Sequence, residues 1–200
     1  MTAPRHLVVD LGGVLFPFDH ARRLRHLAAL LSLPEERVHA LLWTSGFSAA
    51  CDSGAYADAA AVRARVRALT GWTGEDAALD TAWCAAFRPD PRVLAALERH
   101  RGTRTLTLFT NNGPLEEEAL TRLHPAPFEG FGQLLFSHRL GHRKPDPAAY
   151  DAVLARLGAR PGDVLLVDDS AANVEAARRQ GWGAVLHRGP ETIEAIHAAV

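Results

Sequence analysis

The chain has 200 residues, of which 48% are hydrophobic, and its 22 lysines and arginines nearly balance its 23 aspartates and glutamates. This length allows one domain with a large core, or a core that carries a smaller inserted domain. The scattered, balanced charge argues against a nucleic-acid-binding surface, which needs clustered basic residues, and no apolar run is long enough to cross a membrane. We therefore expect a globular, cytoplasmic protein, a monomer or homodimer, with no nucleic-acid or membrane partner.

The two cysteines, Cys51 and Cys84, fall in segments with a helical or nearly helical pattern. Such a low count in a chain of this size is typical of reduced thiols in a protein core rather than of a disulfide framework. We expect both thiols to be free and neither to be catalytic.

The first predicted strand covers residues 7–9, within the stretch LVVDLGGVL at residues 7–15. An unbroken aliphatic run followed by two glycines has the length of a buried parallel strand with a turn behind it. Asp10 then stands at the carboxyl end of the strand, at the edge where open α/β sheets bind ligands. On this stretch alone, Asp10 could equally well cap a turn.

Residues 17–87 change to a helical pattern. The second helix of this segment is predicted to begin at Pro34, which two glutamates follow, and residues 51–56 (CDSGAY) are predicted to form a turn. Apolar residues recur at helical spacing in three groups, with arginines between them: Leu24, Leu27 and Leu31; Val38, Leu41 and Leu42; Val62, Val66 and Leu69. The segment is therefore predicted to be a small all-helical unit inserted after the first strand.

From residue 88 onward, strands and helices alternate. Strands are predicted over 105–109, 133–136, 164–167 and 183–186, and helices over 92–100, 114–123, 147–157, 171–180 and 191–200, with a basic loop at 137–145. This alternation predicts an α/β fold with a doubly wound, Rossmann-like parallel sheet. Residues 1–16 and 88–200 would form the core domain, and residues 17–87 the inserted helical domain.

Polar residues end, or closely follow, four of the predicted strands. They are Asp10, Thr110, Lys144 and the pair Asp168 and Asp169. Because the carboxyl ends of parallel strands share one edge of the sheet, these groups should be neighbours in space. Carboxylates and a lysine in one cleft suit a hard divalent cation and an anionic substrate, and Mg²⁺ commonly binds together with a substrate phosphate.

Four stretches, in this order, resemble the motifs of the haloacid dehalogenase-like (HAD) hydrolases, most of which are Mg²⁺-dependent phosphatases. VVDLGGVL at 8–15 resembles the first motif and LFTNN at 108–112 the second. HRKPDPAAY at 142–150 resembles the third motif, and the run from 165 to 185, which begins LLVDDSAANV, the fourth. The resemblance covers the whole core and is specific in order and spacing. The helical insert is similar to the cap that one branch of the family carries between its first two motifs.

The resemblance implies that the protein is a phosphatase that acts on a small phosphorylated metabolite. Asp10 would be the nucleophile and would form an aspartyl-phosphate. Mg²⁺ would be held by Asp10, the backbone carbonyl of Gly12 and Asp169.

The remaining motif residues would support this chemistry. The resemblance implies that Thr110, the amide of Asn111 and Lys144 bind the phosphate oxygens, with Thr110 and Lys144 counted among the catalytic residues. Asp168 and Asn173 would orient the metal ligands and water.

One position departs from the family pattern. Most phosphatases of the family carry a second aspartate two residues after the nucleophile, where it protonates the leaving group, and this chain has Gly12 there. We therefore expect substrates whose leaving group needs little protonation, such as the anomeric hydroxyl of a sugar phosphate, or a proton taken from water or from the cap.

Two alternatives stay open. One is a 2-haloacid dehalogenase-type hydrolase, a branch that also lacks the second aspartate, although Asp168 and Asp169 would be unfavourable in a metal-free site. The other is a non-catalytic binding or regulatory module with the same fold, against which the presence of Asp10, Thr110 and Lys144 argues.

Other polar and aromatic residues give weaker signals. His138 and His142 flank the lysine and could touch phosphate, but histidines beside a basic loop are usually surface residues. Trp43, Phe47 and Tyr56 of the insert could face the cleft, although aromatic residues at such positions more often form a core. The sequence does not identify the substrate.

Overall fold

The computed structural model describes residues 4–198, and within them the sheet has five parallel strands. The strands are β1 (His6–Val9), β2 (Thr105–Thr110), β3 (Gln133–Phe136), β4 (Val164–Asp168) and β5 (Gly183–Leu186), in the order β3-β2-β1-β4-β5. Val9, the last residue of β1, pairs with Leu108 on one side and Val167 on the other, so β4 extends one residue and β2 two residues beyond it at the same edge. The predicted α/β class with a Rossmann-like sheet is confirmed.

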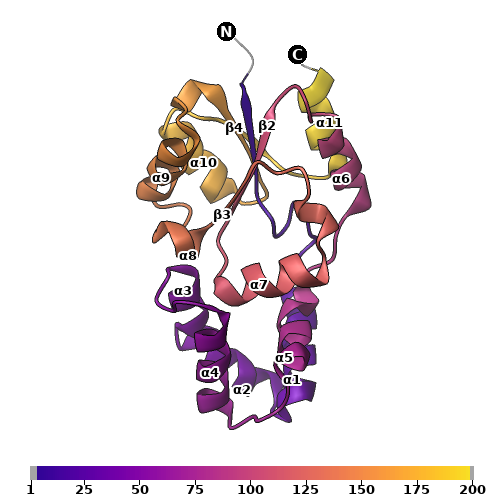
Figure 1. Cartoon of the computed structure of the whole chain (residues 1–200), viewed down its shortest axis with the longest axis vertical. Coiled ribbons are helices and arrows are strands. Elements are labelled where there is room, and N and C mark those ends of the chain that lie inside the picture. Colours follow the sequence, from indigo (N-terminus) through magenta and orange to yellow (C-terminus); the bar gives the residue numbers. More distant parts are fainter. Residues whose placement is uncertain (1–3, 199–200) are drawn as a thin grey trace.

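Helices cover both faces of this sheet (Figure 1). On one face, α9 and α10 pack against Val8, Phe109 and Leu166, whereas α6, α7 and α11 lie over the face that carries Leu7 and Leu108. The bounds are α6 (Pro91–Glu98), α7 (Pro114–Leu123), α8 (Ser137–Leu140), α9 (Pro147–Leu157), α10 (Ala171–Arg179) and α11 (Pro190–Ala198), with single 3₁₀ turns η3 (Ala126–Phe128) and η4 (Pro161–Asp163). Adjacent residues of each strand therefore point into two apolar layers, as expected for a sheet buried on both faces.

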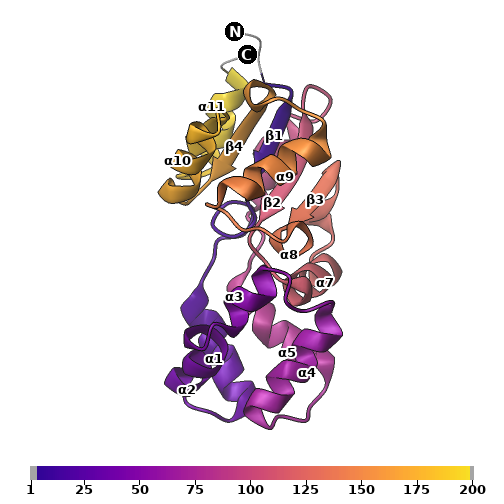
Figure 2. The ribbon, with the colours of Figure 1, turned by 90° about the vertical axis from the view of Figure 1, so that its left-hand side faces the viewer.

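Between β1 and β2 the chain leaves the sheet and forms a separate group of helices beyond its carboxyl edge (Figure 2). These are α1 (His20–Leu31), α2 (Glu35–His39), the π-helical turn η1 (Ala40–Thr44), α3 (Phe47–Asp52), α4 (Ala59–Thr70), α5 (Asp76–Trp83) and the 3₁₀ turn η2 (Cys84–Ala86). We call residues 17–87 the helical insert. Its helical character agrees with the expectation from the sequence.

Local capping explains where the insert helices begin and end. The side chain of Asp19 accepts a hydrogen bond from the Arg22 amide at the start of α1, and Asp58 does the same at the start of α4. These contacts satisfy amide groups that have no partner within the helix. Gly71 ends α4 in the left-handed conformation, which glycine adopts without a steric penalty.

The structure differs from the sequence prediction in several element bounds. The predicted basic loop at 137–145 contains one helical turn, α8, which Gly141 ends in the left-handed conformation. The predicted turn at 51–56 begins only at Ser53, because Cys51 and Asp52 still belong to α3. The last helix begins at Pro190, and residues 199 and 200 of that prediction lie outside the described residues.

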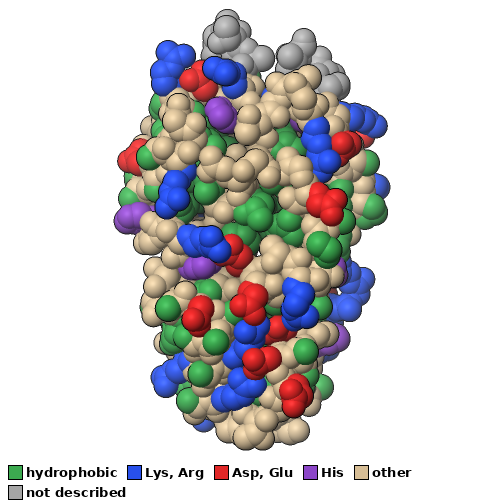
Figure 3. Space-filling view, in the orientation of Figure 1, with side chains coloured by type: hydrophobic (Ala, Val, Ile, Leu, Met, Phe, Trp, Pro, Cys, Tyr) green, Lys and Arg blue, Asp and Glu red, His purple; other side chains and the backbone are tan. Residues whose placement is uncertain are grey.

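Burial and charge follow the composition of the chain. Cys51 and Cys84 are free and buried, and burial raises the pKa of both thiols, so the expectation of free core thiols is confirmed. Figure 3 shows acidic and basic side chains interspersed over the lower half of the face that it presents. Within residues 4–198, no helix is both long and apolar enough to span a membrane.

Candidate active site

A cavity of about 580 Å³ is lined by residues from the carboxyl edge of the sheet and from the helical insert. Asp10 comes from the end of β1, Thr110 from the end of β2, and Asp169 directly follows β4. Lys144 reaches the same cavity from the loop after α8. The polar groups that the sequence placed at separate strand ends therefore lie together, with Gly12, Asn111 and Asn173 also in the cavity wall.

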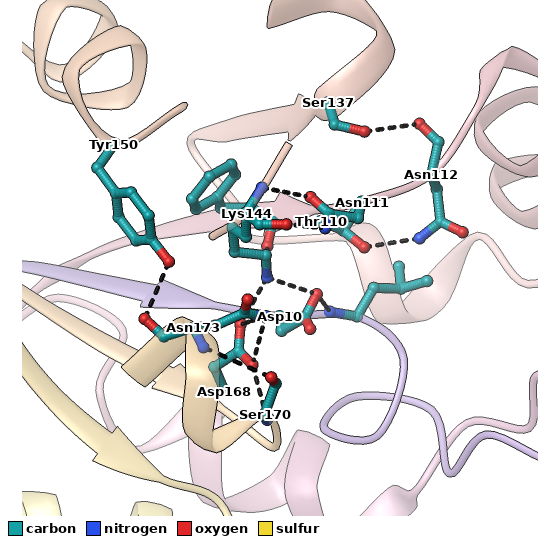
Figure 4. A network of polar contacts seen from close by, with 12 residues as sticks. Asp10, Thr110, Asn111, Asn112, Ser137, Lys144, Tyr150, Asp168, Ser170 and Asn173 are labelled. Atoms are coloured by element: carbon teal, nitrogen blue, oxygen red, sulfur yellow. Dashed lines mark hydrogen bonds and ion pairs between the residues drawn. The ribbon is translucent and has the colours of Figure 1, made fainter. Parts of the chain in front are cut away.

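Lys144 is the centre of the polar network in Figure 4. Its Nζ donates to the Phe109 carbonyl at 2.9 Å and to Asp168 Oδ2 at 2.6 Å, and lies 3.1 Å from Asp10 Oδ1. An ammonium group has three hydrogens, so these partners use its full donor capacity. Burial alone would lower the pKa of Lys144, but Asp10 and Asp168 raise it, so the lysine stays charged. It fixes the Asp10 carboxylate and places a positive charge beside it.

Asp10 is a buried carboxylate with few partners. Its Oδ1 accepts a hydrogen bond from the Leu11 amide at 2.7 Å in addition to the contact with Lys144. Burial raises the pKa of Asp10 to about 6, against the lowering effect of Lys144 and with a further increase from Asp168. Asp10 is therefore mostly ionised at neutral pH, as a nucleophile or metal ligand must be.

Asp168 is fully buried, and the surrounding protein engages both of its oxygens. It accepts hydrogen bonds from the Asn173 side chain at 3.0 and 3.1 Å and from the Ser170 amide at 2.9 Å, besides the contact with Lys144. Tyr150 in turn donates to the Asn173 carbonyl at 2.9 Å. Asp168 and Asn173 thus hold Lys144 in place, whereas the neighbouring Asp169 is exposed.

Three carboxylates could hold a metal ion here. Asp10, Asp168 and Asp169 each place one oxygen within 4.8 Å of the other two. Burial, with a contribution from Asp168, raises the pKa of Asp169. A Cβ on Gly13 would lie 2.0 Å from Asp169 Oδ2, so only glycine leaves this carboxylate room. Clustered carboxylate oxygens are the ligands that Mg²⁺ prefers, and the donor set therefore fits this ion.

The loop after β2 is held to the lysine loop. The Asn111 side chain donates to the Lys144 carbonyl at 2.8 Å and accepts from the Lys144 amide at 2.9 Å. Asn112 donates to Thr110 Oγ1 at 2.6 Å, which leaves the hydrogen of the Thr110 hydroxyl free to donate to another group. Asn112 makes no cap to α7, whose N-cap is Gly113.

Three charged residues that no sequence pattern singled out line the insert side of the cavity: Arg23, Asp52 and Glu116. Arg23 lies among the arginines between the apolar positions of the insert and Glu116 in the predicted helix 114–123, yet both are buried. Asp52 lies in the stretch predicted to be a turn. Their positions result from the packing of the insert against α7, which local patterns do not record.

The aromatic residues and histidines that gave weaker signals differ in whether they line the cavity. Trp43 lines the cavity, whereas Phe47 is buried against Tyr56 and Trp83 within the insert. His138 pairs with Glu117 at 2.6 Å and does not line the cavity, and neither does His142, which lies 3.9 Å from Asp146.

Asp52 has an unusual environment. Its Oδ2 lies 3.7 Å from Arg143 Nη1, and its backbone carbonyl accepts a hydrogen bond from Ser137 Oγ at 2.6 Å. Burial raises the pKa of Asp52 to about 8, and the Glu116 carboxylate adds to this rise. The Asp52 carboxyl therefore resists ionisation in the wall of a cavity that the Glu116 carboxyl also lines.

The chain combines a parallel α/β sheet with clustered carboxylates and a buried lysine at the carboxyl edge of that sheet. This combination is typical of a class of hydrolases. The haloacid dehalogenase-like hydrolase family matches residues 4–181, and the chain belongs to this family.

Two curated relatives are named as phosphatases. A phosphatase of Mycobacterium tuberculosis is 30% identical over 186 residues, which cover 90% of this chain and 85% of the relative. A protein of Thermotoga maritima named phosphorylated carbohydrates phosphatase is 34% identical over 116 residues, or 54% of this chain. That second match spans only 53% of the Thermotoga protein.

Solved structures share the fold at lower identity. A HAD family enzyme of Bacteroides thetaiotaomicron, solved in complex with magnesium and inorganic phosphate, has a TM-score of 0.78 at 21% identity and covers 92% of this chain and 94% of its own. An L-2-haloacid dehalogenase of Xanthobacter autotrophicus has a TM-score of 0.62 at 19% identity, with 90% and 76% covered. At these identities the likeness establishes the fold.

Proposed function

We propose that the protein is a Mg²⁺-dependent phosphatase that cleaves a small phosphate monoester through an aspartyl-phosphate on Asp10. The observation that carries this proposal is the Asp10 carboxylate, held 3.1 Å from Lys144 in a cavity that Thr110 and Asp169 also line. The names of the two curated relatives support a phosphatase. The name of the Thermotoga relative supports sugar phosphates as the first candidate substrates to test.

In this proposal, an Asp10 oxygen attacks phosphorus while the bond from phosphorus to the leaving oxygen breaks. Water then attacks the aspartyl-phosphate and restores the carboxylate, with inorganic phosphate as the second product. The first step brings like charges together, at a cost of about 1 kcal/mol per charge pair at 4 Å in water and several-fold more in a partly dry cleft. Lys144 offsets part of this repulsion from its fixed position beside Asp10.

Positioning would come from the motif loops. The free Thr110 hydroxyl hydrogen and the Asn111 amide would donate to phosphate oxygens, and the mutual hydrogen bonds of Asn111 and Lys144 keep the two loops in register. Asp10, the Gly12 carbonyl and Asp169 would hold Mg²⁺. When bound, this ion would supply countercharge and polarise the phosphoryl oxygens.

Gly12 bears on the choice of substrate. Because glycine cannot transfer a proton, the leaving oxygen must depart with little protonation or take its proton from water or from the insert. In this proposal residues 1–16 and 88–200 act as the catalytic core, and residues 17–87 act as a cap that encloses the leaving group. The protein would work as a monomer or homodimer.

A dehalogenase would use the same nucleophile to attack carbon, and the likeness to the Xanthobacter enzyme and the glycine at position 12 keep this function as the second candidate. The carboxylate cluster favours the phosphatase. Three carboxylates within 4.8 Å of one another are useful to a metal site and repel one another without a cation.

The test is phosphate release from a panel of phosphomonoesters, sugar 1-phosphates included, with Mg²⁺ or with EDTA. We expect release that requires Mg²⁺ and disappears in Asp10→Asn. If none of the esters releases phosphate, the phosphatase proposal fails. Chloride release from 2-chloropropionate would then indicate a dehalogenase, and its absence would point to a non-catalytic module.

A further inference from the structure

The insert side of the cavity contains a buried arginine whose donors are largely unused. Arg23 lines the cavity, yet its side chain is only 4% exposed. Within residues 4–198, its Nε and Nη2 have no hydrogen-bond partner. Its Nη1 lies 3.9 Å from Glu116 Oε1, which is longer than a hydrogen bond. Buried donors without partners are costly, so this arginine needs an explanation beyond packing.

Aromatic rings hold the Arg23 guanidinium in place. Its Cζ lies 5.1 Å from the centre of the Phe87 ring, 5.2 Å from Phe18, 5.7 Å from Trp83 and 5.8 Å from Trp43. Ring faces attract a cation but offer it no acceptor for hydrogen bonds. The guanidinium is therefore fixed at the cavity wall and stays able to donate to a ligand.

Two fixed acceptors line the same cavity as Arg23. Glu116 Oε1 accepts a hydrogen bond from Trp83 Nε1 at 2.6 Å, which orients its carboxyl group. Asp52 is fixed through its backbone contact with Ser137 and its proximity to Arg143, the residue before the lysine. The cavity thus has a phosphate-facing wall on the sheet and a second polar wall on the insert and α7.

We propose that Arg23, Asp52 and Glu116 form the subsite for the leaving group, and that this group is polyhydroxylated, as in a sugar phosphate. This inference rests on the proposed phosphatase function. A hydroxyl group can accept from a guanidinium and donate to a carboxyl oxygen at once, whereas a second anion would face the Glu116 carboxylate. Phe18 and Trp43, which also line the cavity, offer apolar ring faces to the carbon skeleton.

The experiment compares kcat/KM for glucose 1-phosphate, p-nitrophenyl phosphate and 2-phosphoglycolate. The second ester has no hydroxyl groups on its leaving group, and the third carries a carboxylate. In Arg23→Met we expect kcat/KM for the sugar phosphate to fall about 10- to 100-fold, since hydrogen bonds to a charged donor are lost. With p-nitrophenyl phosphate the change should stay within about threefold, because this ester does not use the subsite.

Matched variants separate specificity from folding. Arg25→Met, on the same helix but with a side chain that is 57% exposed, should behave as wild type with all three esters. Asp52→Asn keeps the shape of the side chain and should selectively weaken the sugar phosphate, which provides a second test if Arg23→Met does not fold. Far-ultraviolet circular dichroism checks each variant.

The outcomes are distinct. If wild type hydrolyses none of the esters, the proposed function fails together with the subsite. If wild type is active but both Arg23→Met and Asp52→Asn lower kcat/KM equally for all three esters, the phosphatase stands and the subsite is wrong. A wild-type preference for 2-phosphoglycolate that Arg23→Met abolishes would show an anion site and overturn the polyhydroxylated leaving group.

Discussion

Gly13 determines where the carboxylate of Asp169 can lie. It has a φ of +81°, and a Cβ there would lie 2.0 Å from Asp169 Oδ2. We predict that Gly13→Ala displaces this carboxylate and weakens Mg²⁺ binding about 10- to 100-fold, the usual effect of disturbing the support of a metal ligand. The measurement is the Mg²⁺ concentration that gives half-maximal phosphate release.

Gly102→Ala is the matched control for backbone strain. Gly102 has a φ of +84°, and a Cβ there would have no heavy atom within 4 Å. This variant should lose about 1 kcal/mol of folding stability, because the left-handed backbone conformation costs a residue with a Cβ roughly that amount. Its Mg²⁺ dependence should equal that of wild type. An equal Mg²⁺ dependence in Gly13→Ala would refute the role given to Gly13.

Gly12 leads to a prediction about leaving groups. Without a residue there that can donate a proton, wild-type rates should fall steeply as the pKa of the leaving alcohol or phenol rises. Gly12→Asp should flatten this dependence by accelerating the poorest leaving groups. Gly12→Ala is its steric control, since a Cβ there meets Phe87 and Phe18 at 3.6 and 3.7 Å, ordinary contact distances.

The measurement is kcat/KM across a series of aryl and alkyl phosphates. A wild-type dependence no steeper than that of a relative with aspartate at this position would count against the hypothesis. So would equal rates for Gly12→Asp and Gly12→Ala with every ester.

The residues on the sheet side of the cavity could be predicted from the sequence, whereas those on the insert side could not. Asp10, Thr110 and Lys144 stand at strand ends or in motif loops, and their shared edge follows from parallel strand geometry. Arg23 and Glu116 lie within amphipathic helices, where charged residues are usually solvated. Only the contact between the insert and α7 makes them buried, and one sequence contains no signal for that contact.

At the scale of elements, a buried ion-pair network joins α4, α5 and α7. Arg63 donates to both oxygens of Asp80 at 2.8 Å, and Arg122 Nη2 lies 2.7 Å from Asp80 Oδ2. Asp80→Ala leaves Arg63 with Glu118, 2.7 Å away and 56% exposed, as its remaining carboxylate. We predict a loss of about 3 kcal/mol in the free energy of unfolding, the lower end of the usual cost of breaking a buried pair from one side. Urea denaturation measures it.

An exposed pair provides the control for this prediction. Glu98 Oε2 lies 2.8 Å from Arg101 Nη1 at the end of α6, with both side chains exposed. Glu98→Ala should change stability by less than about 1 kcal/mol, because solvent screens such pairs. If Asp80→Ala is no more destabilising than Glu98→Ala, the network does not stabilise the contact between the insert and the core.

Element bounds followed from the sequence where local chemistry determines them. Residues 114–123 and 133–136 were predicted with the bounds that the structure has, since Pro114 begins the helix and β3 is a short apolar run. The helical turn α8 was missed because its sequence, SHRL, is too short to show a period. The last residue of α3, Asp52, accepts a hydrogen bond from Ser137 of α8 on its backbone carbonyl, a tertiary contact that the local sequence does not show.

At the scale of the whole molecule, the half-buried carboxyl of Asp52 makes stability depend on pH. Its pKa is about 8 in the folded protein, raised by burial and by Glu116, against an ordinary value of 3.8. The stability that this group contributes is fully present below about pH 4 and is lost as pH rises through 8. Asp52→Asn should therefore gain stability relative to wild type between pH 5 and 8. A constant difference in urea midpoint across this range would contradict the assignment.

The overall arrangement could be predicted because alternating strands and helices leave few topologies. The cavity between sheet and insert could not, because its shape depends on how two groups of helices pack. The carboxylate cluster nevertheless has a consequence for the whole fold. Asp10, Asp168 and Asp169 repel one another in the folded chain, and Lys144 is the cation beside two of them. A bound divalent cation would relieve this repulsion, so ligand binding should stabilise the entire molecule.

We therefore predict that Mg²⁺ raises the thermal unfolding midpoint. Binding to the folded state alone adds about 2.7 kcal/mol when free Mg²⁺ reaches 100 times its Kd, which corresponds to roughly 5 to 10 °C for a chain of this size. Asp169→Asn should lose most of this shift, and its midpoint without Mg²⁺ should equal or exceed that of wild type, because one repelling charge is removed. Differential scanning calorimetry with Mg²⁺ and with EDTA measures both effects. A midpoint that rises equally in wild type and Asp169→Asn would mean that the ion binds elsewhere, because the same cluster cannot lose a ligand and keep its full affinity.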